Sequence, residues 1–315
     1  MPTIDDVDQT ADELEALLQR HYIAIAPMSR LENTLLFARK ILDVRKGEEL
    51  PDDADDRLHW RELCGVFALA RQVIRAEQRM PDKFAWLRPL LELFGSETGQ
   101  LAQTAPTTRG SGQELGAEHS DKMFELLVAL CLLPEVDWLQ LDRGRGDNPD
   151  ILYRWHQSPD VLAIACKRMY SREPTRFRDT VIKAIDQIER SVALTGTIFV
   201  SLTNLIDHDA FYPFDGENYI GFSKARLIEM LDAEQDRLSA TTAASDSELA
   251  AAFDDKKAAR GIVHYLGTTY LTGSEEAPVA KAVQRAWTRG VVDPALLDAF
   301  QRGLNSTSSS PGDVA

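Results

Sequence analysis

Cysteine is scarce in this chain, with three residues in 315. Cys64, Cys131 and Cys166 each stand inside an apolar run, and their spacing does not match the ligand spacing of a zinc site. We therefore expect three small buried thiols in a reducing compartment. Neither a disulfide framework nor a structural zinc site is expected.

Long hydrophobic runs are also absent. The longest apolar stretch, 124–133, is interrupted by Glu125 and is much shorter than the roughly 20 residues of a membrane-spanning helix. The acidic segment 1–18 lacks the basic region of a secretory signal, so a cytoplasmic protein with no membrane partner is expected. No GxxxxGK[ST] phosphate loop occurs, so any ATP-driven step would have to come from a partner chain.

Positive charge is in deficit, and the net charge is −15. This argues against a protein that coats nucleic acid, because phosphate binding needs local cations. The charge is uneven, however: residues 1–60 hold 14 Asp/Glu and 7 Lys/Arg (net −7), whereas residues 141–190 hold 8 Asp/Glu and 10 Lys/Arg (net +2). The relatively basic stretch favours a focused substrate groove over a general DNA-binding surface.

The composition, 44% hydrophobic and 27% charged, is typical of a globular protein with one large domain or two ordinary ones. Apolar residues recur at helical spacing through the first hundred residues, and Ser29 with Glu32 forms a capping-box pattern at one predicted helix start. We predict an all-helical N-terminal domain over 1–104. A linker rich in Gly, Ser, Thr and Pro follows at 105–117.

The remainder is predicted to hold a core domain over 118–272, C-terminal helices over 273–303 and a disordered tail over 304–315. The core elements follow from runs of apolar and β-branched residues. They are a buried helix over 120–133, strands at 136–141, 151–153, 161–166, 196–202 and 261–271, and helices over 175–194 and 223–238. Because a helix connects the strands at 161–166 and 196–202, these two strands are predicted to be parallel. Two short helices near 278–289 and 294–302 are expected at the end.

The stretch 147–167 carries the chemistry. Asp150 opens one strand of a predicted hairpin and Lys167 ends the other, so a carboxylate and an ammonium can face each other across the pair. Metal-assisted phosphodiester cleavage requires a hard oxygen ligand for Mg²⁺ and a cation near the attacking hydroxide or the developing phosphorane charge. The hairpin supplies both.

Pro149-Asp150 and Ile164-Ala165-Cys166-Lys167 resemble the active-site hairpin of the PD-(D/E)XK nuclease superfamily, many members of which read Ile-Glu-Cys-Lys at the second motif. The order helix, three strands, helix, strand resembles the restriction-endonuclease-like αβββαβ core, an α/β (α+β) fold. The resemblance implies a Mg²⁺- or Mn²⁺-dependent DNA endonuclease, as in bacterial restriction or anti-phage defence. It also implies DNA as a partner, a homo- or hetero-oligomer, and an ATPase or helicase acting in trans.

The resemblance assigns roles to individual residues. Asp150 becomes the metal-bridging carboxylate, Lys167 the group that orients water, and the Cys166 carbonyl a further metal ligand. Glu125, in the buried helix, either faces the metal or pairs with a lysine at the helix edge, and Glu118 is its alternate two turns earlier. The residues expected to contact DNA phosphates are Arg143, Arg145, Arg168, Arg172, Arg176, Arg178 and Gln187.

Ala165 stands where the family has its second acid, and a methyl group cannot bind Mg²⁺. Three accounts compete: a glutamate replaced by design, a naturally inactive member, or a carboxylate that has migrated to Glu125, Glu173 or Glu189. We favour the first, because the motif departs from the family pattern only there. The alternative function is a non-catalytic subunit with a decayed nuclease fold that binds nucleic acid or scaffolds a complex. A third reading is an α/β domain with no nucleic-acid role.

Overall fold

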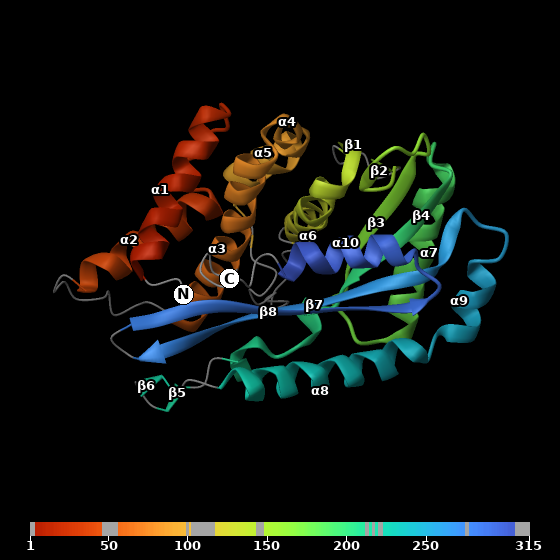
Figure 1. The fold of residues 1–315 in the computed structure, drawn as a ribbon. Helices are drawn as coiled ribbons and strands as arrows, with labels where there is room; N and C mark the ends of the chain where they lie inside the picture. Colours follow the sequence, from red (N-terminus) through yellow and green to blue (C-terminus); the bar gives the residue numbers. More distant parts are fainter. Residues whose placement is uncertain are drawn as a thin grey trace.

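A computed structural model describes residues 4–45, 56–98, 101, 117–142, 148–211, 214–215, 218–219, 223–274 and 277–305. These residues form a mixed α/β protein in which helices pack around one six-stranded sheet (Figure 1). The predicted linker 105–117 and tail 304–315 lie outside the described residues, apart from Ala117, Leu304 and Asn305, which belong to helices.

The described residues between 4 and 96 are mostly helical, as predicted. The helices are α1 (Ile4–Arg20), α2 (Arg30–Arg45), α3 (Asp56–Arg79), α4 (Pro81–Phe84) and α5 (Arg88–Ser96). The predicted capping box starts α2: the Ser29 hydroxyl accepts a hydrogen bond from the Glu32 N–H at 3.1 Å, and the Glu32 carboxylate accepts one from the Met28 N–H at 2.6 Å. The start of this helix is therefore encoded locally.

The sheet has the strand order β1-β2-β3-β4-β7-β8. Its strands are β1 (Val136–Leu141), β2 (Ile151–Trp155), β3 (Leu162–Arg168), β4 (Thr195–Ser201), β7 (Ala258–Ser274) and β8 (Ala277–Gly290). The first three pair antiparallel, β3 and β4 pair parallel, β4 and β7 pair parallel, and β7 and β8 pair antiparallel. The helix α7 (Pro174–Arg190) connects β3 to β4, which confirms the predicted parallel pair.

The two faces of the sheet belong to two hydrophobic clusters. Ile164 and Cys166 of β3 pack with α6 (Ala117–Leu132), α10 (Pro294–Asn305) and the N-terminal helices. Ala163 and Ala165 pack on the opposite face with α7, α8 (Lys224–Ala243) and α9 (Asp246–Ala252). Side chains on a strand alternate between faces, so neighbouring residues of β3 serve different cores. A two-stranded hairpin, β5 (Phe214–Asp215) with β6 (Asn218–Tyr219), stands apart from the sheet.

The predicted helix over 278–289 is wrong, because this segment is strand β8. Its residues are rich in Ala, Lys, Gln and Arg, which favour helix in isolation. They pair instead with β7 continuously from Gly261↔Gly290 to Ser274↔Ala277, and tertiary pairing overrides local propensity. The long β7–β8 hairpin reaches towards α3 in Figure 1, and the sheet continues past residue 272. One C-terminal helix, α10, remains of the two predicted after residue 273.

None of the helices in the described part of the chain is long and apolar enough to cross a membrane.

Two histidines are buried inside this fold in the neutral form. His208 is held by the Thr268 hydroxyl at 2.9 Å and by the Thr203 carbonyl at 2.8 Å. His264 lies between the rings of Phe177 and Trp287, and neither of its ring nitrogens has a hydrogen-bond partner among the described residues. Burial lowers the pKa of both imidazoles from 6.5 to about 3.

We expect the protein to lose stability as the pH falls from about 6.5 towards 3. The unfolded chain binds protons at these two histidines in that range and the folded chain does not, so each lowers the unfolding free energy by about 1.4 kcal/mol per pH unit. The variant His264→Phe should lose part of this slope and gain about 1 kcal/mol at pH 7, because two unpaired buried nitrogens are removed. Urea unfolding at several pH values measures both effects, and an unchanged slope in the variant would contradict the assignment.

Candidate active site

Asp150 stands immediately before β2, and its backbone carbonyl accepts a hydrogen bond from the Asp142 N–H at 2.9 Å. Its side chain is only 9% exposed. One carboxylate oxygen, Oδ2, accepts the Cys166 N–H of β3 at 2.7 Å. A hydrogen bond from a backbone N–H to a charged carboxylate is strong, so this bond fixes the orientation of the Asp150 carboxylate.

Lys167 of β3 reaches the same carboxylate, with its Nζ 3.4 Å from Asp150 Oδ2. The two side chains therefore meet across the β2–β3 pair, as the hairpin pattern predicts. Lys167 is half-buried. Its ammonium is close enough to interact with Asp150 and retains solvent access.

Glu125 comes to the same place from α6. It is 2% exposed, and both of its oxygens lie close to the Lys122 ammonium, Oε1 at 2.8 Å and Oε2 at 2.9 Å. The same Lys122 Nζ is 3.8 Å from Asp150 Oδ1. Glu125 therefore pairs with a lysine, as one of the two alternatives expects, and it also lies beside Asp150. Lys122 itself was not predicted, although its i,i+3 spacing to Glu125 indicates a helix-face pair.

The electrostatics of this group follow from burial. Desolvation, followed by the charge of Asp150, raises the pKa of Glu125 well above its ordinary value, and Lys122 only partly opposes this. Burial alone would lower the pKa of Lys122, but Glu125 and Asp150 together raise it. Burial and the two carboxylates also raise the pKa of the Cys166 thiol. Cys166 therefore contributes its backbone to the site and keeps a neutral side chain.

Ala165 is fully buried and lies beside Asp150 in the sheet. Ile151 pairs with Ile164 in the antiparallel β2–β3 ladder, so the next position places Asp150 across from Ala165. Alternation along β3 puts residues 165 and 167 on the same face. A carboxylate at position 165 would adjoin both Asp150 and Lys167.

Two other candidate carboxylates, Glu189 and Glu173, are not brought to this group. Glu189, near the end of α7, lies beside Lys257 and accepts its backbone N–H. Lys257 in turn contacts Gly196, at the start of β4 and thus at the opposite end of the sheet. Glu173 is exposed at the N-terminus of α7 and lies 3.9 Å from Arg176. Glu118 falls within α6, which begins at Ala117, and its side chain lies outside the described part of the structure.

The predicted phosphate-contacting residues fall into three groups. Arg143 and Arg145 lie outside the described residues. Arg168 is 5% exposed and donates to the Asn204 side chain, and Arg172 donates to the Leu205 carbonyl at 3.0 Å. Arg168 is thus directed into the protein, and a phosphate contact does not fit its position, whereas Arg172 remains exposed. Exposed Arg176, half-buried Gln187 and Arg178, which bonds Glu248, lie on α7.

The described residues contain no cluster of three or more His, Cys, Asp or Glu side chains that could hold a metal ion. The site instead offers two carboxylates, Asp150 and Glu125, with two ammonium groups, Lys122 and Lys167. One or two protein carboxylates, completed by water and substrate phosphate, are a usual Mg²⁺ ligand set. In comparisons with known proteins, no family model, no curated protein and no solved structure matches this chain.

Proposed function

We propose that the chain is a metal-dependent phosphodiesterase of the endonuclease type, acting on DNA, whose second acid is missing at position 165. The observation that carries the proposal is the convergence of Asp150, Glu125 and Lys167 from three separate elements. Glu125 lies on α6, Lys167 on β3 and Asp150 immediately before β2, and burial and a backbone hydrogen bond fix the Asp150 carboxylate in place. Such preorganisation is typical of catalytic groups.

The two carboxylates fit a divalent cation because a cation already lies between them. The Lys122 ammonium is 2.8 Å from Glu125 and 3.8 Å from Asp150. A buried carboxylate pair needs such a counter-charge, since desolvation and mutual repulsion otherwise favour protonation. When bound, Mg²⁺ or Mn²⁺ supplies Lewis acidity and makes a water molecule a stronger nucleophile.

The residues of the chain then have separable tasks. Asp150, anchored by the Cys166 N–H, holds its free oxygen in a fixed direction. Lys167, 3.4 Å from Asp150, is placed to donate to a phosphate oxygen or to hold the attacking water. A glutamate at position 165 would add a further carboxylate beside Asp150 and Lys167. With alanine there, we expect the chain to bind divalent ions and DNA weakly and to cleave slowly.

The alternative function, a non-catalytic subunit that binds nucleic acid or scaffolds a complex, has one observation in its favour. Lys122 and Lys167 together balance the charges of Glu125 and Asp150, so the site is electrostatically complete without any metal. A nuclease fold that has lost its activity would be expected to keep these buried carboxylates neutralised by lysine residues.

The test is cleavage of supercoiled plasmid by the chain and by the variant Ala165→Glu, with Mg²⁺, with Mn²⁺ and with EDTA. The proposal expects nicked and linear products from the variant in divalent ion, none in EDTA, and little from the parent chain. Retained DNA binding with no cleavage by the variant would favour the non-catalytic subunit. Cleavage by the parent and the variant at equal rates would instead indicate a migrated carboxylate.

Removal of Lys122 should strengthen metal binding. In Lys122→Met the competing ammonium is lost, and two unit charges about 4 Å apart interact by about 4 kcal/mol at an effective dielectric of 20. We therefore expect Mn²⁺ affinity to rise at least about tenfold, measured by calorimetry. Lys83→Met, in which the lost ammonium contacts the carbonyls of Leu133 and Val136, is the matched control. An unchanged affinity in Lys122→Met would argue against a cation site between the carboxylates.

A further inference from the structure

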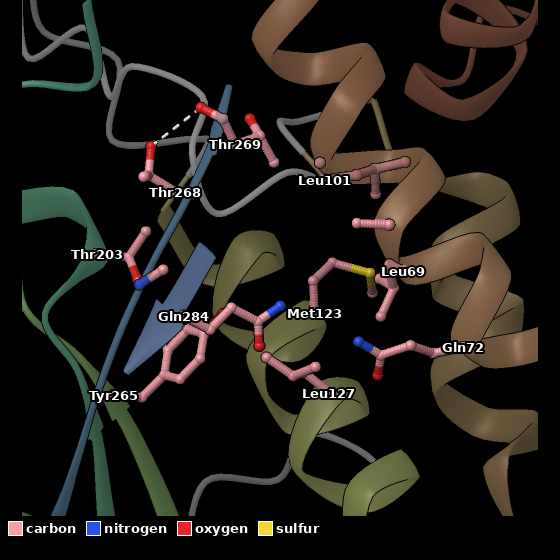
Figure 2. A pocket seen from close by; sticks show the side chains of 13 residues that line it. Leu69, Gln72, Leu101, Met123, Leu127, Thr203, Tyr265, Thr268, Thr269 and Gln284 are labelled. Atoms are coloured by element: carbon pink, nitrogen blue, oxygen red, sulfur yellow. Dashed lines mark hydrogen bonds between the residues drawn. The ribbon is translucent and has the colours of Figure 1, made fainter. Parts of the chain in front are cut away.

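A pocket lies on the other side of α6 from the Asp150 site. Met123 and Leu127 of α6 form one wall, α3 contributes Leu69 and Gln72, and β7 contributes Tyr265 (Figure 2). Successive helix residues are about 100° apart, so Met123 and Leu127 point away from Lys122 and Glu125. The pocket is therefore distinct from the carboxylate group.

Two amide side chains face this pocket with hydrogen-bonding atoms that have no partner among the described residues. They are Nε2 of Gln72 and Oε1 of Gln284 on β8. Gln72 is only 7% exposed, and Figure 2 shows both amides directed into the space between α3 and β7. Buried polar groups are normally paired, so an unpaired donor and an unpaired acceptor in one pocket indicate a ligand that offers the complementary pair.

The remaining walls indicate a flat and neutral ligand. Leu69, Leu101, Met123 and Leu127 are apolar, and none of the described lining residues is charged, which disfavours a phosphate or carboxylate. The ring of Tyr265 is held in place by stacking on Phe124, with centroids 5.5 Å apart, and forms a rigid wall. An apolar pocket with a few convergent polar groups is the usual form of a small-molecule site.

The size limits the part of the ligand that lies inside the pocket to a single ring. The cavity volume is about 60 Å³. A cavity needs about 15 Å³ of this volume for each water molecule, so it holds roughly four. Four water molecules occupy about 120 Å³ in the liquid, which is close to the volume of one six-membered heterocycle. A purine with its second ring does not fit this volume.

We propose that this pocket binds a pyrimidine base, with the Gln72 amide donating to a ring acceptor and the Gln284 amide accepting from the adjacent donor. Every pyrimidine presents such a donor–acceptor edge. The base belongs either to a nucleic-acid strand or to a free nucleoside, and the chemistry of recognition is the same for both. The proposal does not depend on the nuclease function, since none of its residues belongs to the carboxylate group.

The experiment is ligand-observed NMR titration of the full chain in EDTA with uridine, cytidine, adenosine and guanosine, and with dT and dA oligonucleotides. We expect saturable binding of uridine or cytidine, with purine nucleosides at least tenfold weaker. Binding of dT oligonucleotide much tighter than uridine identifies a strand as the source, and equal or weaker binding identifies the free nucleoside. Gln72→Leu and Gln284→Leu should each weaken pyrimidine binding at least tenfold.

Gln301→Leu is the matched control, because Gln301 lies on α10 and donates to the Ala286 carbonyl at 3.2 Å, outside the pocket. It should leave binding unchanged. Each pocket variant removes an unpaired polar atom, so both variants should fold, and thermal unfolding measures this. If one variant does not fold, the other still tests the proposal. No saturation by any pyrimidine ligand at millimolar concentration, or equal affinity in Gln72→Leu and the parent, would overturn the proposal and leave a pocket filled with water.

Discussion

In a chain carrying Ala165→Glu, the further change Asp150→Asn is expected to lower metal-dependent cleavage about 1000-fold, equivalent to roughly 4 kcal/mol of transition-state stabilisation. The reason is the loss of one negative charge at a hard oxygen ligand. Asparagine keeps the shape and an oxygen that can accept the Cys166 N–H, so the backbone contact at 2.7 Å can persist. Initial rates of plasmid nicking with Mn²⁺ measure the effect.

The control for this change is Asp160→Asn, the same substitution at an exposed position in the turn of the same hairpin. It should cleave like its parent. Thermal unfolding of Asp150→Asn should shift little, because the weaker hydrogen bond is offset by relief of repulsion with Glu125, whose pKa Asp150 raises. If the Asp150→Asn variant kept its rate within about threefold, a value that corresponds to under 1 kcal/mol, Asp150 could not be a metal ligand.

Lys167→Met is expected to slow cleavage about 100-fold in the same background, while Mn²⁺ affinity is kept or raised. The ammonium acts on the nucleophile or on the phosphate charge, and loss of one such preorganised donor typically has an effect of this order. Lys167→Arg should recover part of the rate, because it keeps the charge but changes the geometry. Single-turnover kinetics together with calorimetry separate the loss of rate from any loss of binding.

Lys183→Met, on the exposed side of α7, serves as the matched lysine control. If weaker Mn²⁺ binding accounted for the whole loss of rate in Lys167→Met, the role of Lys167 would be to hold Asp150, 3.4 Å away, in place. Lys167 would then take no part in the chemical step. An unchanged rate would remove Lys167 from the site altogether.

The sequence predicts those helix starts and strands that depend on residues close together in the chain. The Ser29–Glu32 box marks a helix start, and the apolar runs around Asp150 and Lys167 predict two paired strands that bring these residues together. The helix predicted between β3 and β4 indicates that these two strands are parallel, because a connection through a helix returns the chain to the same end of the sheet. These features depend on neighbouring residues, so the sequence contains them directly.

The remaining features depend on contacts between distant segments. β8 is a strand because β7 pairs with it along its whole length, although its composition favours helix. The i,i+3 spacing of Lys122 and Glu125 indicates their pairing, but the approach of Lys122 to Asp150 depends on the packing of α6 against the sheet. Arg168 is expected from the sequence to contact DNA phosphate, but strand alternation places it on the face opposite Lys167 and in the core.

A crystal structure of the Ala165→Glu variant, grown with Mn²⁺ and measured at the manganese absorption edge, tests the proposed metal site most directly. We expect an anomalous peak at coordination distance from the Asp150 and residue-165 carboxylates, with the Lys122 ammonium moved from its present position 3.8 Å from Asp150. A structure with no manganese at this place and with Lys122 still between Glu125 and Asp150 would contradict this expectation.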